Sequence, residues 1–205
     1  MPEGSPANSN VTRLRPARRD VTRARICAAA KQVFLNVGYG GATLEQIALA
    51  ADLRRSTVYN HFRDKNDILG AIAEDYLEAV TAVISRLPPK PSRRQIDRWV
   101  AEFADFVVRE RAPTLLVVHG TAALEVPPAT LEFAAKLLEA FAAQVPAFAE
   151  AIEPGQERKL ARAYCVLREL GWALCYHIET EGGDLARYKL EVAADLLEQF
   201  VKGWF

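Results

Sequence analysis

The side chains over residues 54–61 are of the kinds that contact DNA in a groove. Arginine can pair bidentately with guanine and asparagine with adenine, and a threonine methyl can pack on that of thymine. On a short helix the outward set is Arg54, Arg55, Thr57, Asn60 and His61, and the inward set is Leu53, Val58 and Phe62. This spacing predicts one polar face for a major groove and one apolar face for packing on the rest of the protein.

Two helices are expected before this segment. The first begins near Asp20, a suitable N-cap, and runs to Val37, with Gly38 as its stop because glycine adopts the left-handed conformation at low cost. Thr43 then caps a second, short helix, with Gln46 three residues later in the position of a capping box.

A break at 52–56 separates this helix from a third short one over 55–61, and a long fourth helix is expected over 65–87. Two short helices joined by a tight turn and braced by longer ones form a helix-turn-helix.

Charge is distributed unevenly along the 205 residues, although the net charge is zero. Residues 1–65 hold eleven Lys/Arg against five Asp/Glu, a net charge of +6, so the remaining 140 residues carry −6. A basic end on an acidic body directs one part of the molecule towards a polyanion. Chance clustering is the alternative on charge alone.

The same segment resembles the DNA-binding region of the tetracycline-repressor (TetR) family over about residues 20–70. The resemblance rests on Phe34-Leu35-Asn36-Val37-Gly38-Tyr39, Thr43-Leu44-Glu45-Gln46-Ile47-Ala48, Ser56-Thr57-Val58-Tyr59-Asn60-His61-Phe62 and Asp64-Lys65-Asn66-Asp67-Ile68-Leu69. One position departs from the family pattern, since Asp52 stands where the turn usually has glycine. Aspartate tolerates the left-handed conformation better than most residues, so the turn is expected to form with some strain.

The resemblance implies a role for each polar residue of the motif. Arg54, Arg55, Thr57 and Asn60 are the candidates for base edges, while Thr43 with its backbone N–H, Tyr59, His61 and Lys65 are the candidates for phosphates. The arginines at 13, 15, 18 and 19 lie in a predicted disordered tail over residues 1–19. This tail either follows the minor groove of DNA or adds only a weak, salt-sensitive attraction to DNA, and we favour the second interpretation.

Beyond Pro88-Pro89-Lys90-Pro91 the chain predicts five more helices, at roughly 92–111, 113–123, 127–145, 155–181 and 185–203. The predicted fold is all-α with about nine helices: a helix-turn-helix domain over 20–65 joined by the long fourth helix to an effector-binding and dimerisation domain over 66–205. The last two helices carry two apolar stripes each, which predicts burial against both their own subunit and a partner. The resemblance implies the same homodimer.

The resemblance also implies a small-molecule inducer pocket among the middle helices. The candidate lining residues are Phe103, His119, Phe133, Arg168, Trp172 and Tyr176. An apolar lining with few polar groups favours a hydrophobic or aromatic ligand. Release of a repressor by that ligand is the expected mechanism, with activation as an open alternative.

Other classes of function lack their motifs. The sequence has no Gly-rich phosphate loop, no paired metal ligands and no nucleophile motif, so no enzyme, cofactor or metal site is expected. No apolar run reaches membrane-spanning length and the N-terminus lacks a signal-peptide core, so we expect no membrane partner and a cytoplasmic protein with reduced, buried Cys27, Cys165 and Cys175. A helical scaffold with a degenerate DNA-binding end is the remaining alternative.

Overall fold

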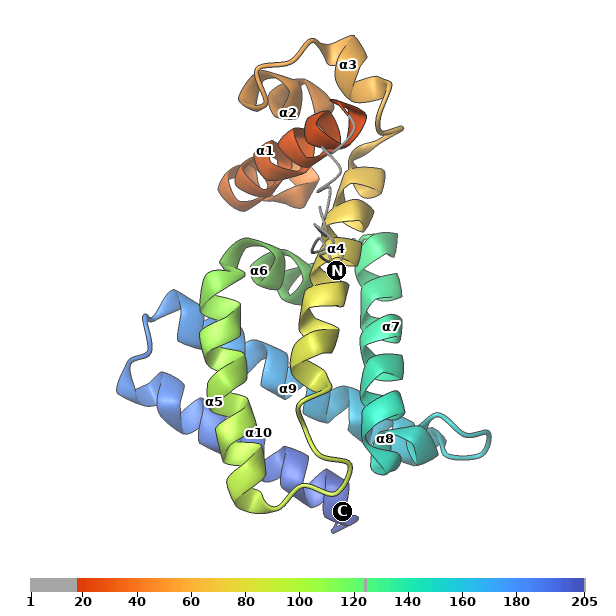
Figure 1. Ribbon diagram of the computed structural model, residues 1–205, viewed down its shortest axis with the longest axis vertical. Coiled ribbons are helices and arrows are strands. Elements are labelled where there is room, and N and C mark those ends of the chain that lie inside the picture. The colour runs from red at the N-terminus through yellow and green to blue at the C-terminus, as the bar shows by residue number, and fades with distance from the viewer. Residues whose placement is uncertain (1–17, 124, 205) are drawn as a thin grey trace, which may run out of the picture.

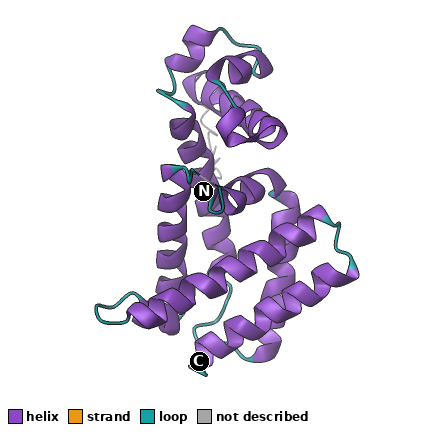
Figure 2. Cartoon of the chain, turned by 180° about the vertical axis from the view of Figure 1, so that it is seen from behind, coloured by secondary structure: helices purple, strands orange, loops and turns teal. Residues whose placement is uncertain are grey.

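The structure is a computed structural model that describes residues 18–123 and 125–204. Regular structure within these residues consists of ten helices and no strand, which confirms the all-α prediction. Figures 1 and 2 show an elongated molecule, with α1–α3 at one end, α5–α10 at the other and α4 running from one to the other. The helices are α1 (Arg18–Gly41), α2 (Leu44–Ala50), α3 (Arg55–Tyr59), α4 (Lys65–Ile84), α5 (Arg93–Arg109), α6 (Arg111–Gly120), α7 (Pro128–Gln144), α8 (Pro146–Ala151), α9 (Glu157–Glu179) and α10 (Asp184–Lys202).

Helix α1 is interrupted at Gly38, where φ is 76° and ψ is 154°. The predicted glycine stop is therefore confirmed, and one further turn follows it. Val37, the last residue of the predicted first helix, is 48% exposed because the chain turns away at the next residue. The helix starts at Arg18, two residues before the predicted cap, so Arg18 and Arg19 belong to its first turn. The rest of the predicted tail lies outside the described residues.

Local signals in the sequence determine the ends of the two short helices. At the start of α2 the Thr43 hydroxyl accepts the Gln46 N–H at 3.2 Å, and Gln46 Oε1 accepts the Thr43 N–H at 2.9 Å, which confirms the capping box. Asp52, in the turn before α3, has φ of 50° and so takes the left-handed conformation as predicted.

Helix α4 belongs to two hydrophobic cores. Its first two turns, through Ile72, pack with α1–α3, and the residues from Ala73 onward pack in the larger core formed with α5–α10. The first core contains Ile26, Ala30, Phe34, Ile47, Val58, Phe62, Ile68 and Ile72, all at most 3% exposed. A single helix that is packed in both cores couples movement of one to movement of the other. The domain boundary at 65/66 stays a prediction.

The body differs from the predicted helices in three places. Pro146, taken as a break, is the first residue of a tenth helix, α8, because the first turn needs no N–H donor. For the same reason α6 begins at Arg111, two residues before Pro113. Helix α4 ends at Ile84 rather than at residue 87, although Leu87 is still fully buried. Within the described residues no helix has the length and apolarity that a membrane span requires.

Candidate DNA interface and ligand cavity

Helix α3 has the predicted polar and apolar faces. Val58 is fully buried and Phe62 is 3% exposed, whereas Arg54, Arg55 and Asn60 are exposed. Leu53, Thr57 and His61 are half-buried, so Thr57 and His61 lie at the edge of the polar face. Contacts of these side chains with bases stay predictions.

Arg55 is held by two neighbouring side chains. Its Nη2 lies 2.7 Å from Glu45 Oε1 on α2 and donates to the Tyr59 hydroxyl at 3.0 Å. The hydrogen bond to Tyr59, and then the charge of Glu45, raise the pKa of the Arg55 guanidinium. Sequence reasoning did not identify Glu45 as a partner of Arg55, because an acidic residue is unexpected on the face of the protein that is predicted to meet phosphates. Arg55 can therefore reach DNA only by leaving this pair.

The turn at Asp52 is fastened to α1 by Arg25. The Arg25 Nη2 atom donates to the Asp52 carboxylate at 3.0 Å and to the Asp52 carbonyl at 3.1 Å. Sequence reasoning also missed this contact, because the two residues are 27 positions apart. The aspartate that replaces glycine thus supplies a side-chain acceptor that glycine lacks.

Two of the residues predicted to contact phosphates, Thr43 and Tyr59, already form hydrogen bonds within the protein. The Thr43 N–H, expected to face a phosphate, already donates to Gln46 inside the capping box. Tyr59 is 44% exposed and its hydroxyl accepts from Arg55, and His61 is half-buried. A phosphate contact by Thr43 therefore depends on its hydroxyl.

Lys65 is a structural clamp at the base of the motif. Its Nζ donates to the carbonyls of Tyr39 at 2.8 Å, Gly40 at 2.9 Å and Ala42 at 3.3 Å, and lies 4.7 Å from the centre of the Tyr39 ring. These three carbonyls use all the donors of the ammonium group. The predicted phosphate contact by Lys65 would require at least one of these bonds to break.

Lys65→Met is expected to destabilise the protein by about 1–3 kcal/mol, since carbonyls that now accept from a charged donor would lose their partner. Thermal and denaturant unfolding would measure the loss, with exposed Lys90→Met as the matched control. Weaker DNA binding at an unchanged unfolding midpoint would instead assign Lys65 to phosphate contact alone.

Arg63 and Asp67 form a second fastening, at the junction of α3 and α4. The Asp67 carboxylate accepts from Arg63 Nε and Nη2, both at 2.8 Å, and from the Arg63 backbone N–H at 3.1 Å. These bonds, the guanidinium's first, lower the pKa of Asp67 from 3.8 to about 2. These bonds hold the exposed Arg63 side chain in one position beside α3.

This shift predicts an acid-dependent contribution to stability. Because the folded pKa lies below the unfolded one, the contribution is fully present above pH 3.8 and is lost as the pH falls to about 2. Asp67→Asn should therefore destabilise the protein near pH 6 and converge with the wild type in strong acid. Denaturant unfolding across this range would measure it, with exposed Asp75→Asn as the control. A difference independent of pH would refute the charge-based origin.

A cavity opens between α6, α7 and α9 in the body. Its outer part, of about 320 Å³, includes Phe133 and Arg168 in its lining, and its inner part, of about 40 Å³, includes Phe103 and again Phe133. The two parts also share Val117, Val118, Leu137, Leu167 and Gly171. Three of the six predicted pocket residues therefore meet at this cavity.

The inner end reaches Tyr76 on α4. The Tyr76 ring stacks between Phe106 and Phe133, with centroid separations of 5.9 and 5.6 Å. Its hydroxyl lies 2.9 Å from that of Thr114 on α6, which donates to the Glu110 carbonyl at 2.7 Å. Burial raises the pKa of Tyr76, so the phenol stays neutral. Sequence reasoning did not identify this link.

The other three predicted pocket residues are not among those that line the cavity. His119 stacks on Trp172 at 5.3 Å, and its Nε2 lies 3.4 Å from Glu179 Oε1. Tyr176 is half-buried, with the Lys189 ammonium 5.3 Å from its ring centre. These three residues were predicted from their type alone, and the structure places His119 on α6 against Trp172 of α9, away from the cavity lining.

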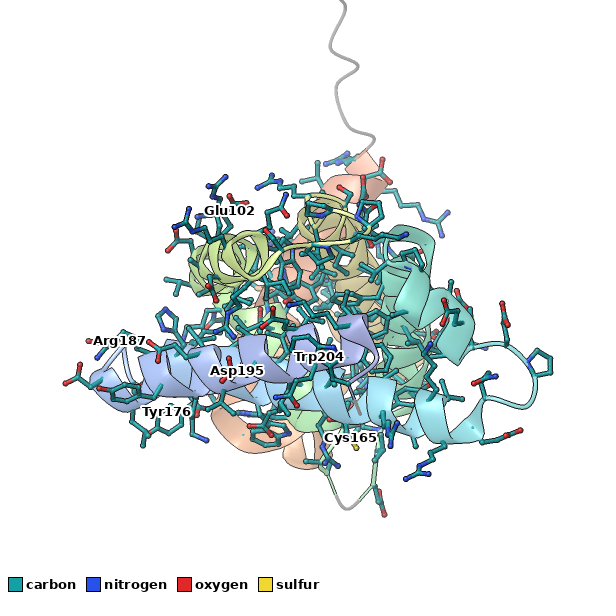
Figure 3. All side chains as sticks on the ribbon, turned by 90° about the horizontal axis from the view of Figure 1, so that it is seen from below. Glu102, Cys165, Tyr176, Arg187, Asp195 and Trp204 are labelled. Carbon is teal, nitrogen blue, oxygen red and sulfur yellow. The ribbon has the colours of Figure 1, made fainter. Side chains whose placement is uncertain are left out.

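The last two helices leave apolar side chains uncovered, as the two-stripe pattern predicted. The exposed ones are Tyr164 and Trp172 on α9 and Leu185, Tyr188 and Val192 on α10. In Figure 3, Cys165 and Tyr176 lie along one outer edge of α9. Phe200 of α10 is buried, and its ring centroid lies 4.6 Å from that of Phe148 on α8. We call the five exposed residues the α9–α10 apolar surface.

The cysteines are only partly as predicted. Cys27 and Cys175 are buried, and burial raises their pKa values to about 11 and about 12. Cys165 is exposed, because its position on α9 faces away from the core, so the prediction of a buried thiol is wrong there.

Comparisons with known proteins agree with this architecture. A family model described as "Bacterial regulatory proteins, tetR family" matches residues 26–72, the helix-turn-helix and the start of α4. The repressor DhaR of Mycobacterium sp. (strain GP1) is 26% identical over 185 residues, which cover 89% of this chain and 90% of DhaR. The repressor BepR of Brucella suis biovar 1 is 47% identical over 51 residues, 25% of this chain and 24% of BepR.

The fold is also found among solved structures. A TetR-like transcriptional regulator from Rhodococcus sp. RHA1 superposes with a TM-score of 0.61 at 20% identity, covering 91% of this chain and 96% of that one. The family-model match over residues 26–72 and the similarity to DhaR along nearly the whole length both point to a transcriptional regulator of the TetR family, and the fold is the one found in such regulators.

Proposed function

We propose that the protein is a repressor that binds a pseudo-palindromic operator as a homodimer, through α3 of each subunit, and that a hydrophobic small molecule releases it. The observation that carries this proposal is the exposed polar face of α3. The opposite face of this segment is buried in the first core, which holds the polar side chains outward. Two such helices in a symmetric dimer could enter successive major grooves. A cytoplasmic location, where operator DNA lies, is part of the proposal.

The α9–α10 apolar surface supports the dimer. Its five large exposed side chains come from two helices packed side by side. Contiguous apolar patches on a monomer commonly mark an interaction site. A two-fold interface made by the same two helices of both subunits would cover them.

Release by a ligand is supported by the position of α4. Tyr76 lines the inner cavity, and the first turns of the same helix pack in the core of the DNA-binding end. A ligand that displaces the Tyr76 ring would favour another position of α4, and so another separation of the two α3 helices. Such coupling requires only that the ligand bind one arrangement better than the other.

Repression rather than activation is proposed because DhaR and BepR, which this chain resembles, are both repressors. Another curated relative, FasR of Mycolicibacterium smegmatis, is an activator, so a reporter fused to the bound promoter is needed to decide. Higher reporter output after deletion of the regulator would support repression, and lower output would support activation.

Selection of genomic fragments by the purified protein tests DNA recognition. The expected product is a small set of fragments that share an inverted repeat, with half-sites centred about 10 base pairs or a multiple apart. The selection is run at moderate salt, where non-specific binding is weak. Recovery without enrichment of any sequence would contradict the proposal and favour the scaffold alternative.

A further inference from the structure

The outer cavity is lined mainly by apolar side chains and has one charged side chain, Arg168. Leu131, Ala134 and Leu137 of α7 face Val117 and Val118 of α6 across it, with Leu167 of α9 alongside. The polar groups in the lining are those of Thr121, Tyr164, Cys165 and Arg168. No carboxylate occurs among the described lining residues, so nothing in the lining neutralises the arginine.

Arg168 is also free of partners elsewhere. Within residues 18–123 and 125–204 no hydrogen bond or ion pair engages its guanidinium. Some other arginines of the described residues are paired, since Arg25, Arg63 and Arg93 each contact a carboxylate. Arg168 lies one helical turn from both Tyr164 and Trp172 on α9, so in the proposed dimer its guanidinium lies between the cavity and the interface. A planar cation with five donors at this place matches a carboxylate or a comparable anion.

The inner part fits the opposite end of a ligand. Its volume of about 40 Å³ is bounded by the rings of Tyr76, Phe103, Phe133 and Phe141. The Tyr76 hydroxyl is already paired with Thr114, and no charged residue lines this part. The inner end therefore suits the tip of an alkyl or aryl group.

Gly171 lies where the two parts join, because it lines both. A Cβ atom there would lie 3.4 Å from Val118 Cγ2, in van der Waals contact across the passage. The glycine leaves the space between α6 and α9 free of a side chain where the linings of the two parts meet. A larger side chain at this position would close the passage without altering the arginine.

We propose that the cavity binds an amphipathic organic anion, whose carboxylate or similar group pairs with Arg168 and whose hydrophobic body extends past Gly171 towards Tyr76. This inference rests on the proposed function, because it assumes that this cavity is the effector site. To the proposed function it adds that the ligand is negatively charged and that its charged end lies at the outer part of the cavity. A neutral hydrophobic compound of the same shape would lack the contact to the guanidinium.

The test compares 6-phenylhexanoate with 6-phenylhexan-1-ol, which differ in the charged group and share the hydrophobic body. Isothermal titration calorimetry with the full-length protein should show the acid binding at least roughly 10-fold more tightly than the alcohol, as a charge-assisted bond warrants. Arg168→Gln should remove that preference and leave alcohol binding unchanged, while Arg168→Lys should keep part of it. The matched control is Arg158→Gln, an exposed arginine of α9 that does not line the cavity.

Gly171→Leu should weaken both compounds, and Arg168→Gln provides the independent variant should the leucine impair folding. Equal affinity for acid and alcohol, an unchanged preference in Arg168→Gln, or no binding of the acid at about 1 mM would overturn the inference. If the acid bound tightly and in an Arg168-dependent manner but left the operator affinity unchanged, the inference about the ligand would stand. That result would contradict the induction model of the proposed function. The two failures are therefore distinguishable.

Discussion

Arg54→Ala is expected to weaken strongly the preference of the protein for its operator, and to do so more than Arg55→Ala. Arg54 is exposed at the N-cap of α3 and makes no capping bond with its side chain. Arg55 must first leave Glu45 and Tyr59, so part of any DNA contact it makes is offset. The freely available arginine should therefore contribute more to base recognition.

The expected magnitude follows from the two-fold symmetry of the proposed complex. Loss of one bidentate base contact costs about 1–3 kcal/mol, and a dimer would lose it in both half-sites. The affinity for the operator should fall by at least roughly 30-fold, while the affinity for unrelated DNA changes little. Fluorescence anisotropy at fixed salt measures both, with Arg86→Ala, an exposed arginine just beyond the C-terminal end of α4, as the control. An equal loss on operator and unrelated DNA would reassign Arg54 to the phosphates.

Glu45 provides an independent check on the same pair. Glu45→Gln would remove a negative charge from the DNA face and weaken the hold on Arg55. We expect tighter binding to DNA, by a few-fold, with a protein of unchanged stability, because exposed ion pairs contribute only about 0–1 kcal/mol. The same anisotropy assay measures the change. Weaker binding by this variant would indicate that the pair orients Arg55 for its contact.

The second large effect is expected at the α9–α10 apolar surface. The double variant Tyr188→Glu, Val192→Glu places a carboxylate on two successive turns of α10, where the wild type has side chains 52% and 51% exposed. Burying unpaired carboxylates in an interface is costly, so the variant should be a folded monomer. Its operator affinity should fall by roughly 100-fold or more, because linking two DNA-binding domains raises their combined affinity by at least that factor.

Light scattering after size-exclusion chromatography measures the mass, and circular dichroism confirms the helical content. The control is Val108→Glu, which introduces the same charge at a 53% exposed valine on α5. A double variant that remained dimeric would place the interface elsewhere. A monomer with undiminished operator affinity would remove the need for a dimer.

The sequence predicted the DNA-binding end well because its signals are local. Thr43 and Gln46 form a cap three residues apart, Gly38 breaks a helix, and Asp52 accepts the left-handed turn. Each of these depends on backbone preferences that neighbouring residues determine. The inward positions Val58 and Phe62 likewise follow from periodicity alone.

What the sequence could not predict is long-range. Arg25 and Lys65 fasten loops that lie 23 or more residues away in the chain, and no local pattern marks either contact. Lys65 was assigned to phosphate from its place in the motif, whereas its ammonium group is directed at carbonyls of the α1–α2 connection. The ligand cavity was predicted by residue type, and only Phe103, Phe133 and Arg168 of that set line it.

A hydroxyl-radical footprint of the selected operator fragment tests the central claim most directly. A dimer that inserts two α3 helices should protect two patches of backbone, symmetric about the centre of the inverted repeat and about 10 base pairs or a multiple apart. Arg54→Ala should lose both patches together at the same protein concentration. One unpaired patch, or uniform protection along the fragment, would contradict a symmetric dimer that reads sequence through α3.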